Sequence, residues 1–468
     1  MDLWDDIESA YRERTPTSRE RYHETRNHVP AGVASTYRAW DPYPLFIERA
    51  EGPYLHDVDG NRYIDFDMNN GAGMSGHAHP AITEAVTDQL EKGTLFTHPH
   101  DLLAEAAKEL KARWDSVDLV RFTNSGTEST MHAIRLARAY SGRDKLLKIE
   151  GAYHGAHDYV LVSKAAQAGK LGHPKRPNKV VESEGVPEVV AETVEVAPWN
   201  DLEAVEAIMR EHVNEIGALI VEPIVMNVGM TQPYDEFLHG LRELCDEYGI
   251  VYIFDEVKTG VKVAPGGAAE HYGVEPDLVT MAKSIGGNLP VGAFGGKEHI
   301  MRHIEDGAAH YGTYNGSPLV LRALVTQLRD VLTEDAYDHV DSLGERLVSG
   351  YEDVMDDHGI VGHVEHVNSQ GQVLFTDRVV RNYRDWLDAI DDEFHENYWF
   401  AMLERGVMPH PHHSSQQWTI SVQHEAEHID EHIEAFKDVA PRLAEEQPRY
   451  MDVSSASKPS EPEPLAED

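Results

Sequence analysis

Short apolar segments alternate with helical segments through the middle of the chain, and this alternation constrains the fold more than any other feature. The strand candidates are residues 119–124, 145–150, 218–223, 250–256 and 278–283. Helical periodicity marks further candidates at 80–92, 101–114, 127–141, 201–213 and 234–248. Strands that are buried on both faces read as continuous apolar runs, so this pattern predicts a parallel sheet covered by helices on both sides. We therefore expect an α/β fold with a large, doubly wound, mostly parallel sheet.

The segments outside this alternation predict a second, smaller α+β domain built from both ends of the chain. Residues 1–66 read as a helix followed by short strands, and residues 67–325 form the large domain. Residues 326–446 return to mixed helix and strand signals and complete the small domain. Residues 447–468 are rich in Pro, Ser and Glu, a composition that predicts a disordered acidic tail.

The charge balance excludes several classes of partner. Acidic residues number 82 and basic residues 41, which gives a formal net charge of −41. Nucleic acid and anionic membrane surfaces would be repelled by this charge, so neither is expected as a partner. A diffuse acidic surface is typical of proteins that work in high salt, where screening weakens self-repulsion. We interpret the chain as a cytoplasmic protein of a halophile; the alternative is an acidic protein from ordinary salt.

Membrane, secretory and metal signals are missing from the sequence. Cys245 is the single cysteine, which excludes a disulfide within the chain. No apolar run is long enough to span a membrane, and the acidic start lacks the apolar core of a signal peptide. Histidine pairs such as His77 with His79 have no HExxH or Cys partner, so we expect no functional metal site.

The segment NSGTEST at 124–130 lies where a strand gives way to a helix. Small residues at such a turn leave backbone N–H groups free, and the helix N-terminus adds a partial positive charge. The hydroxyl groups of Ser125 and Thr127 add further donors. The segment therefore predicts an anion cradle, most naturally for a phosphate. The alternative is that its Ser and Thr residues only cap the helix.

Two further polar residues stand at the ends of apolar strands. Asp255 ends IVYIFD, and Lys283 ends LVTMAK. In open α/β sheets, ligands bind at the carboxyl ends of the strands. A lysine that is removed from water has a lowered pKa and becomes a nucleophile suited to a Schiff base. The alternatives are a helix cap at Asp255 and a lysine that reaches solvent at Lys283.

A phosphate cradle, a carboxylate and an amine at three strand ends are the groups that pyridoxal phosphate requires. The cradle holds the phosphate, the carboxylate keeps the pyridine nitrogen protonated, and the lysine reacts with the aldehyde. The sequence therefore predicts pyridoxal 5'-phosphate as cofactor, with pyridoxamine 5'-phosphate as the form that carries the amino group during the cycle.

From about residue 28 to residue 445 the chain resembles the class III aminotransferases of fold type I. The branch that it resembles most is that of the glutamate-1-semialdehyde 2,1-aminomutases. The segments that carry the resemblance, in order, include RFTNSGTEST, EGAYHGAHD, LIVEPIVMNVGM, YGIVYIFDEVKTG, EPDLVTMAKSIGGNLPVGAFGG and GTYNGSP.

This resemblance implies a role for each matching residue. Lys283 would hold the cofactor as a Schiff base and move protons, and Asp255 would pair with the pyridinium nitrogen. Arg38 and Gln416 would bind the substrate, Arg38 through a carboxylate. Thr313 would reach the cofactor of a neighbouring subunit, which makes a homodimer with interfacial sites the expected assembly. The other implied cofactor residues are Ser125, Gly126, Thr127, Tyr153, His154, Glu222, Asn227 and Val257.

Some segments of the chain depart from the aminomutase pattern, and these departures bear on the choice between an aminotransferase and the aminomutase. They are MNNGAGMSG at 68–76, HPHD at 98–101, Gln416 or its neighbours in place of a substrate-pocket glutamate, and Lys258 beside the expected cofactor ring. Because they cluster around the expected substrate, we predict an aminotransferase between small amino donors and carbonyl acceptors. The alternative is the aminomutase, which makes 5-aminolevulinate. A racemase, and a non-catalytic protein on the same fold, are less favoured, the latter because Lys283 is present.

Overall fold

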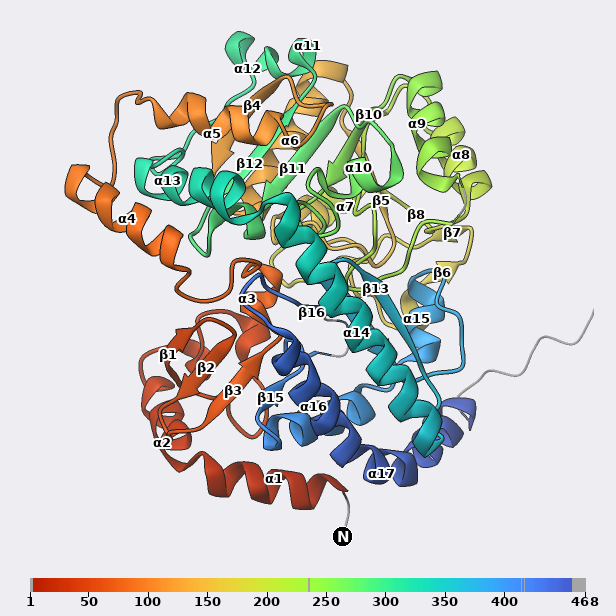
Figure 1. Cartoon of the computed structure of the whole chain (residues 1–468). Helices are drawn as coiled ribbons and strands as arrows, with labels where there is room; N and C mark the ends of the chain where they lie inside the picture. Colours follow the sequence, from red (N-terminus) through yellow and green to blue (C-terminus); the bar gives the residue numbers. More distant parts are fainter. Residues whose placement is uncertain (1–2, 235, 414, 416, 457–468) are drawn as a thin grey trace, which may run out of the picture.

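The computed structural model describes residues 3–234, 236–413, 415 and 417–456. Its centre is a seven-stranded sheet (Figure 1). Within the described residues, the strands run across this sheet in the order β4 (Leu119–Thr123), β12 (Gly292–Gly296), β11 (Leu278–Ala282), β10 (Val251–Asp255), β9 (Ile216–Val221), β5 (Lys145–Ile149) and β8 (Val194–Ala197).

Six of these strands are parallel to one another, and β12 is antiparallel to both of its neighbours, β11 and β4. The predicted mostly parallel sheet is therefore confirmed, but β8 and the glycine-rich β12 were missed. In β12, a Cβ atom on Gly296 would lie 2.1 Å from the backbone oxygen of Asp277. Close backbone approach thus explains the glycines of this strand.

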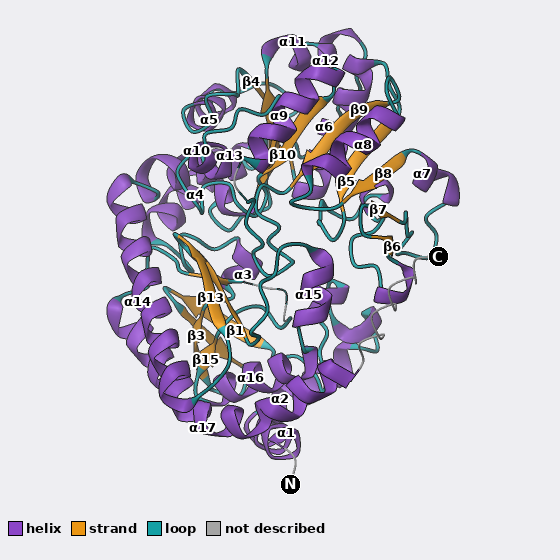
Figure 2. Cartoon of the chain, turned by 90° about the vertical axis from the view of Figure 1, so that its right-hand side faces the viewer, coloured by secondary structure: helices purple, strands orange, loops and turns teal. Residues whose placement is uncertain are grey.

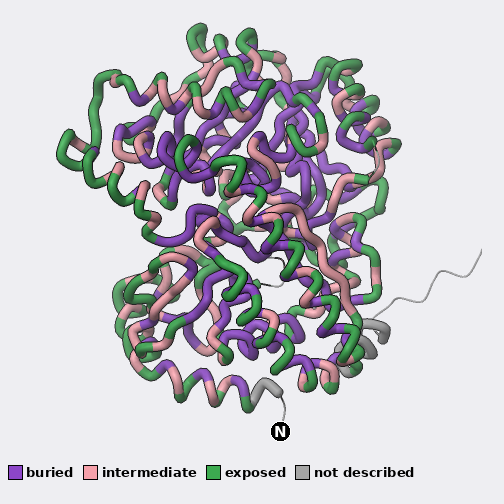
Figure 3. Tube along the Cα trace, viewed as in Figure 1, coloured by how far each residue is buried: buried purple, intermediate pink, exposed green. Residues whose placement is uncertain are grey.

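Alternate residues of the central strands pack against two different layers of helices. Tyr252 and Phe254 of β10 belong to the core shared with α8 (Leu202–Glu211) and α9 (Phe237–Tyr248). Val251 and Ile253 of the same strand belong to the core shared with α6 (Gly126–Ser141). Burial on both faces explains why β10 is apolar at every position before Asp255. Figure 3 shows the sheet buried and the outer helices exposed.

Further helices complete the layers around the large sheet (Figure 2). They are α4 (Pro80–Lys92), α5 (Leu102–Lys111), α7 (Glu188–Glu192), α10 (Gly267–Tyr272), α11 (Glu298–Met301), α12 (His303–Asp306) and α13 (Pro318–Thr326). A small hairpin of β6 (Gly172–His173) and β7 (Arg176–Pro177) lies in the segment before α7.

Both ends of the chain build two smaller sheets below the large one (Figures 1 and 2). The first contains β1 (Ile47–Glu51), β2 (Tyr54–Asp57), β3 (Arg62–Asp65) and β15 (Val407–Met408). The second contains β13 (His363–Val367), β14 (Gln370–Leu374) and β16 (Trp418–Thr419). The surrounding helices are α1 (Leu3–Arg14), α2 (Pro16–Thr25), α14 (Glu334–His358), α15 (Tyr383–Ala389), α16 (Asp392–Glu404) and α17 (Ala426–Ala456).

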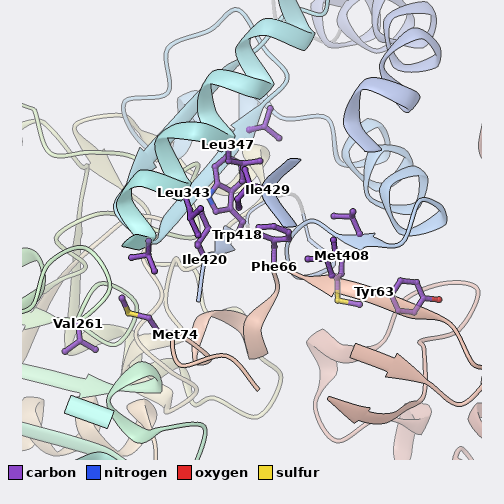
Figure 4. Close-up of a cluster of buried hydrophobic side chains, with 14 of the residues drawn as sticks. Tyr63, Phe66, Met74, Val261, Leu343, Leu347, Met408, Trp418, Ile420 and Ile429 are labelled. Atoms are coloured by element: carbon purple, nitrogen blue, oxygen red, sulfur yellow. The ribbon is translucent and has the colours of Figure 1, made fainter. Parts of the chain in front are cut away.

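One hydrophobic core joins these smaller sheets to the long helices. Leu343 and Leu347 of α14 lie with Trp418 of β16, and Phe66, which follows β3, lies beside them (Figure 4). Phe66 and Leu347 are fully buried. Parts of the chain that are distant in sequence therefore share one apolar cluster below the large sheet.

The C-terminal helix continues further than the sequence indicates. Helix α17 extends to Ala456, so the tail predicted from residue 447 is helical in its first ten positions; residues 457–468 lie outside the described residues. Pro441 and Pro448 lie inside this helix, and neither ends it. Among the described residues, none of the helices is long and apolar enough to cross a membrane.

Candidate active site

A cavity of about 590 Å³ opens where β10 and β11 end and α6 begins. Ten residues predicted for the site line it: Arg38, Ser125, Gly126, Thr127, Tyr153, His154, Glu222, Asp255, Val257 and Lys283. Asn227 is not among the lining residues but binds one of them, Lys258. Thr313 is exposed and does not line the cavity. Gln416 lies outside the described residues.

The start of α6 forms one wall of the cavity. Ser125 caps the helix by accepting a hydrogen bond from the backbone N–H of Glu128 at 3.2 Å. Glu128 reciprocates, because its carboxylate accepts the backbone N–H of Asn124 at 2.8 Å. The predicted capping role is therefore present, and the helix N-terminus still faces the cavity with its partial positive charge.

Two glycines bring the neighbouring segments close to this helix start. A Cβ atom on Gly126 would lie 2.9 Å from the side chain of Val257. A Cβ atom on Gly155 would lie 2.7 Å from Oγ1 of Thr127, and Gly155 has φ of +104°. Only glycine fits at these positions without displacing a cavity wall.

Asp255 ends β10 with a carboxylate that three donors hold in place. Nδ1 of His154 lies 2.8 Å from one oxygen, and the other oxygen accepts Oγ1 of Thr280 at 3.0 Å and the N–H of Val257 at 3.1 Å. The register of β10 and β11 pairs Asp255 directly with Thr280. Asp255 is only 3% exposed, so these bonds replace the water that a buried charge requires.

His154 is neutral in this arrangement. Burial lowers its pKa, although the neighbouring Asp255 opposes the shift. A carboxylate accepts hydrogen bonds but cannot donate them, so the proton of the neutral ring is on Nδ1. Its other nitrogen, Nε2, is buried and has no partner among the described residues.

Lys283 follows β11 and begins a short helical turn, Lys283–Gly286. Its backbone is left-handed, with φ of 51°, a strained conformation that non-glycine residues adopt rarely. Burial lowers the pKa of its amine, and the nearby charges of Asp255 and Glu222 oppose the shift. The structure thus places a partly desolvated amine at the cavity wall, which is suited to nucleophilic attack.

Glu222 lines the cavity beside Tyr153. Its carboxylate accepts the backbone N–H of Tyr153 at 2.7 Å. Burial and the charge of Asp255 raise the pKa of Glu222 to about 7. Glu222 thus positions the Tyr153 segment and is a carboxyl group able to exchange a proton near neutral pH.

The side chain of Lys258 is buried and lines the cavity; the sequence alone did not show whether it would face the site or solvent. Its Nζ donates to Oδ1 of Asn227 at 2.6 Å and to Oε1 of Gln417 at 2.8 Å. Burial lowers its pKa to about 7, with a further contribution from the charge of Lys283. Gln417 is the described neighbour of the predicted Gln416, so the segment before β16 does reach the site.

Arg38 lies at the open side of the cavity. Its side chain is exposed, and its Nε donates to Oγ of Ser35 at 3.1 Å and to the hydroxyl of Tyr37 at 3.2 Å. Both acceptors are neutral, so the guanidinium charge can be offered to an anion that enters the cavity.

Pyridoxal phosphate fits this set of residues. The glycine-bounded start of α6 suits the phosphate, and the carboxylate of Asp255 suits the pyridinium nitrogen. The amine of Lys283 suits the aldehyde. Within the described residues, no group of three or more His, Cys, Asp or Glu side chains could hold a metal ion. The fold and the site define a pyridoxal phosphate-dependent enzyme of fold type I.

Comparison with known proteins gives the family. The pattern described as "Aminotransferase class-III" matches residues 36–440, and the chain belongs to this family. A glutamate-1-semialdehyde 2,1-aminomutase from Methanopyrus kandleri is 42% identical over 439 residues, which cover 93% of this chain and 99% of the relative. The aminomutase from Salinibacter ruber is 44% identical over 398 residues, covering 84% and 89%.

Solved structures agree on the fold. An omega-transaminase from Sphaerobacter thermophilus matches with a TM-score of 0.88 and 33% identity, covering 93% of this chain and 99% of that one. A glutamate-1-semialdehyde-aminomutase from Pseudomonas aeruginosa PAO1 matches with a TM-score of 0.86 and 27% identity, covering 94% and 98%. A variant of the latter was solved in complex with PMP.

The preference for an aminotransferase over the aminomutase was wrong. Five curated relatives, at 38–44% identity over most of the chain, are glutamate-1-semialdehyde 2,1-aminomutases. The prediction gave four local departures more weight than this overall similarity. One of them is structural, because Nε2 of His100 in HPHD binds the backbone oxygen of Gly316 at 2.9 Å.

Several residues of the site were missed from the sequence. Thr280 binds Asp255, and Asn69, Asn124 and Asn288 line the cavity. A signal for Thr280 was available, because it is the one hydroxyl in the otherwise apolar segment LVTMA. Asn124 and Asn69 lie in segments that the sequence had singled out, NSGTEST and MNNGAGMSG, although neither residue was given a role. Asn288 gave no such signal, since it lies in a turn, where Asn is common.

Proposed function

We propose that this chain is a glutamate-1-semialdehyde 2,1-aminomutase. The observation that carries the proposal is the match to the Methanopyrus kandleri aminomutase, at 42% identity over 93% of this chain. The reaction moves the amino group of glutamate-1-semialdehyde from C2 to C1, and C2 becomes the carbonyl carbon in place of C1. Substrate and product are isomers, and the product is 5-aminolevulinate, so no second amino donor or acceptor is consumed.

The bound cofactor supplies an electron sink that stabilises negative charge on the carbon next to the amino group. With the cofactor bound, Lys283 would take a proton from that carbon and return one to another carbon. Its amine is partly desolvated at the cavity wall, and burial lowers its pKa, which increases the fraction of neutral amine able to accept a proton. Glu222, with a pKa of about 7, is near enough to influence the charge of Lys283.

The other walls orient the cofactor and the substrate. Asp255, fixed by His154, Thr280 and Val257, would keep the pyridine nitrogen protonated. The first turn of α6 would bind the phosphate. Arg38 would pair with the substrate carboxylate at the open side of the cavity.

A homodimer that works in high salt completes the proposal. Thr313 stands on an exposed segment between Tyr311 and Tyr314, which are 86% and 64% exposed. A second copy packed on this segment would bury these aromatic side chains and bring Thr313 toward the neighbouring cofactor. The net charge of −41 supports function in concentrated salt, where repulsion between the copies is screened.

The test is conversion without an acceptor. The purified protein, loaded with the cofactor in molar salt, should form 5-aminolevulinate from glutamate-1-semialdehyde with no 2-oxo acid added. Lys283→Ala is the matched control and should form none. If product appears only when an amino donor and a 2-oxo acid are supplied together, the proposal is wrong.

A further inference from the structure

The short element α3 (Met68–Gly71) is a strained turn in the cavity wall. Its backbone φ values are 43° at Met68, 59° at Asn69, 58° at Asn70 and 75° at Gly71. Asn69 and Ala72 line the cavity. Consecutive left-handed residues other than glycine persist only where the surrounding structure holds them in place.

Two donors hold this turn through one atom, the backbone oxygen of Gly71. Nζ of Lys262 donates to it at 2.8 Å, and Oγ of Ser284 donates to it at 3.0 Å. Lys262 and Ser284 are both 0% exposed. Within the described part of the chain, this carbonyl is the one hydrogen-bond acceptor of the Lys262 amine.

The same junction connects the turn to the residue next to Lys283. Ser284 follows Lys283 directly, and its own backbone oxygen accepts Nε2 of Gln327 at 3.0 Å. Gly71 packs tightly against Lys262, because a Cβ atom at position 71 would lie only 3.0 Å from Nζ of Lys262. The buried hydroxyl of Ser284 thus joins this cavity wall to the strand end that carries Lys283, and the buried amine of Lys262 joins the same wall to the segment after β10.

Burying a lysine amine against a single carbonyl group costs desolvation free energy, so its presence here calls for a structural role. Burial lowers the pKa of Lys262, and the charges of Lys283 and Lys258 contribute to the shift. The backbone oxygen of Lys262 in turn accepts Oγ of Ser369 at 3.0 Å. Lys262 therefore links the segment after β10, the loop before β14 and the turn at Gly71.

We propose that Lys262 is a positioning residue that holds the turn Met68–Gly71 in its left-handed form and thereby sets where Asn69 stands in the cavity. This inference deepens the proposed function and rests on it for the identity of the substrate. Asn69 offers an amide, whose N–H groups can donate to a substrate carboxylate. Loss of Lys262 should weaken substrate binding more than the chemical step.

Hydrogen–deuterium exchange of the full-length, cofactor-free protein tests the positioning directly. In Lys262→Met, exchange in the peptide covering residues 66–76 should be at least 10-fold faster, because the bonds from Gly71 N to Asp67 O and from Gly73 N to Met68 O would open more often. Lys148→Met is the matched control. Lys148 is also 0% exposed and also donates to a backbone oxygen, that of Ile149 at 3.0 Å.

The proposal is overturned if the turn exchanges at the wild-type rate in Lys262→Met, or equally fast in Lys148→Met. If Lys262→Met does not fold, Ser284→Ala removes the other donor and should accelerate the same peptide; an unchanged rate there overturns the proposal. Lys262→Arg, which keeps a cationic donor, should restore most of the protection.

Kinetics supply the second readout. Lys262→Met should raise KM for glutamate-1-semialdehyde at least 10-fold while kcat changes less than 3-fold; the reverse split would overturn the positioning role. If the wild-type protein makes no 5-aminolevulinate, the proposed function fails, and the exchange result still decides the role of Lys262.

Discussion

Replacing Asp255 by Asn tests how the site holds its charge. The change removes the negative charge and leaves one oxygen, which can keep the bonds from Thr280 and Val257. The new amide group would then face Nδ1–H of His154, donor against donor. His154 can avoid this clash by moving its proton to Nε2, which is buried and has no partner among the described residues. If the amide flips instead, its oxygen accepts from His154 but the N–H of Val257 loses its acceptor.

Two magnitudes follow from this geometry. A buried N–H without an acceptor costs about 1–3 kcal/mol, so the cofactor-free variant should be less stable by about that amount. A hydrogen bond to a charged partner contributes about 1.5–3 kcal/mol, so loss of the carboxylate should weaken cofactor binding roughly 10- to 150-fold. Turnover should fall further, because the pyridine nitrogen would no longer be kept protonated.

Three measurements check the prediction: denaturant unfolding of the cofactor-free protein, titration with pyridoxal phosphate, and the rate of 5-aminolevulinate formation. The control is Thr87→Val, which removes a hydroxyl that binds a backbone oxygen on the exposed helix α4. Unchanged cofactor affinity and turnover in Asp255→Asn would refute the reasoning, since the carboxylate would then have no part in binding the ring.

Three further predictions concern protonation and substrate binding. Burial lowers the pKa of His432 to about 3, and its Nε2 accepts the hydroxyl of Tyr351 at 2.7 Å. The stability that it contributes is complete above its unfolded pKa of about 6.5 and is lost as the pH falls toward 3. Between pH 7 and pH 5, the free energy of unfolding of His432→Gln should therefore fall by about 2 kcal/mol less than that of the wild type, as measured by denaturant unfolding. An equal fall in both proteins would contradict this. We assign the step near pH 7 in the pH dependence of activity to Glu222, whose pKa the charge of Lys258 lowers. Lys258→Met should therefore move this step to higher pH, whereas Lys258→Arg should not. A shift to lower pH would contradict the assignment to Glu222. Arg38→Ala should raise KM for the substrate about 10-fold or more with the cofactor still bound, and an unchanged KM would mean that another group binds the carboxylate.

Much of the fold could be predicted because burial on both faces leaves a strong trace in the sequence. Val251 to Phe254 are apolar since β10 contacts helices on both sides, and the polar Asp255 then marks the end of the strand at the ligand edge. Strand β12 gave no such trace. Its glycines are selected by backbone contacts with β4 and β11, which only the folded sheet reveals.

The residues of the site likewise fall into those that the sequence could predict and those that only the folded structure reveals. Lys283, Asp255 and Ser125 were predictable because each is a polar residue at the end of an apolar strand or the start of a helix. Lys258 and Lys262 were not, because they follow β10 in a turn where a lysine usually reaches solvent. Only the tertiary contacts to Asn227, Gln417 and Gly71 show that both side chains are buried.

The most direct test of the central claim is to find where the cofactor is attached. The protein loaded with pyridoxal phosphate is treated with borohydride, digested, and mapped by mass spectrometry. The account predicts one cofactor-modified peptide, carrying the label on Lys283, and no label in Lys283→Ala. Label on Lys258 or Lys262 instead, or none on the wild-type protein, would contradict the assignment of this cavity as the active site.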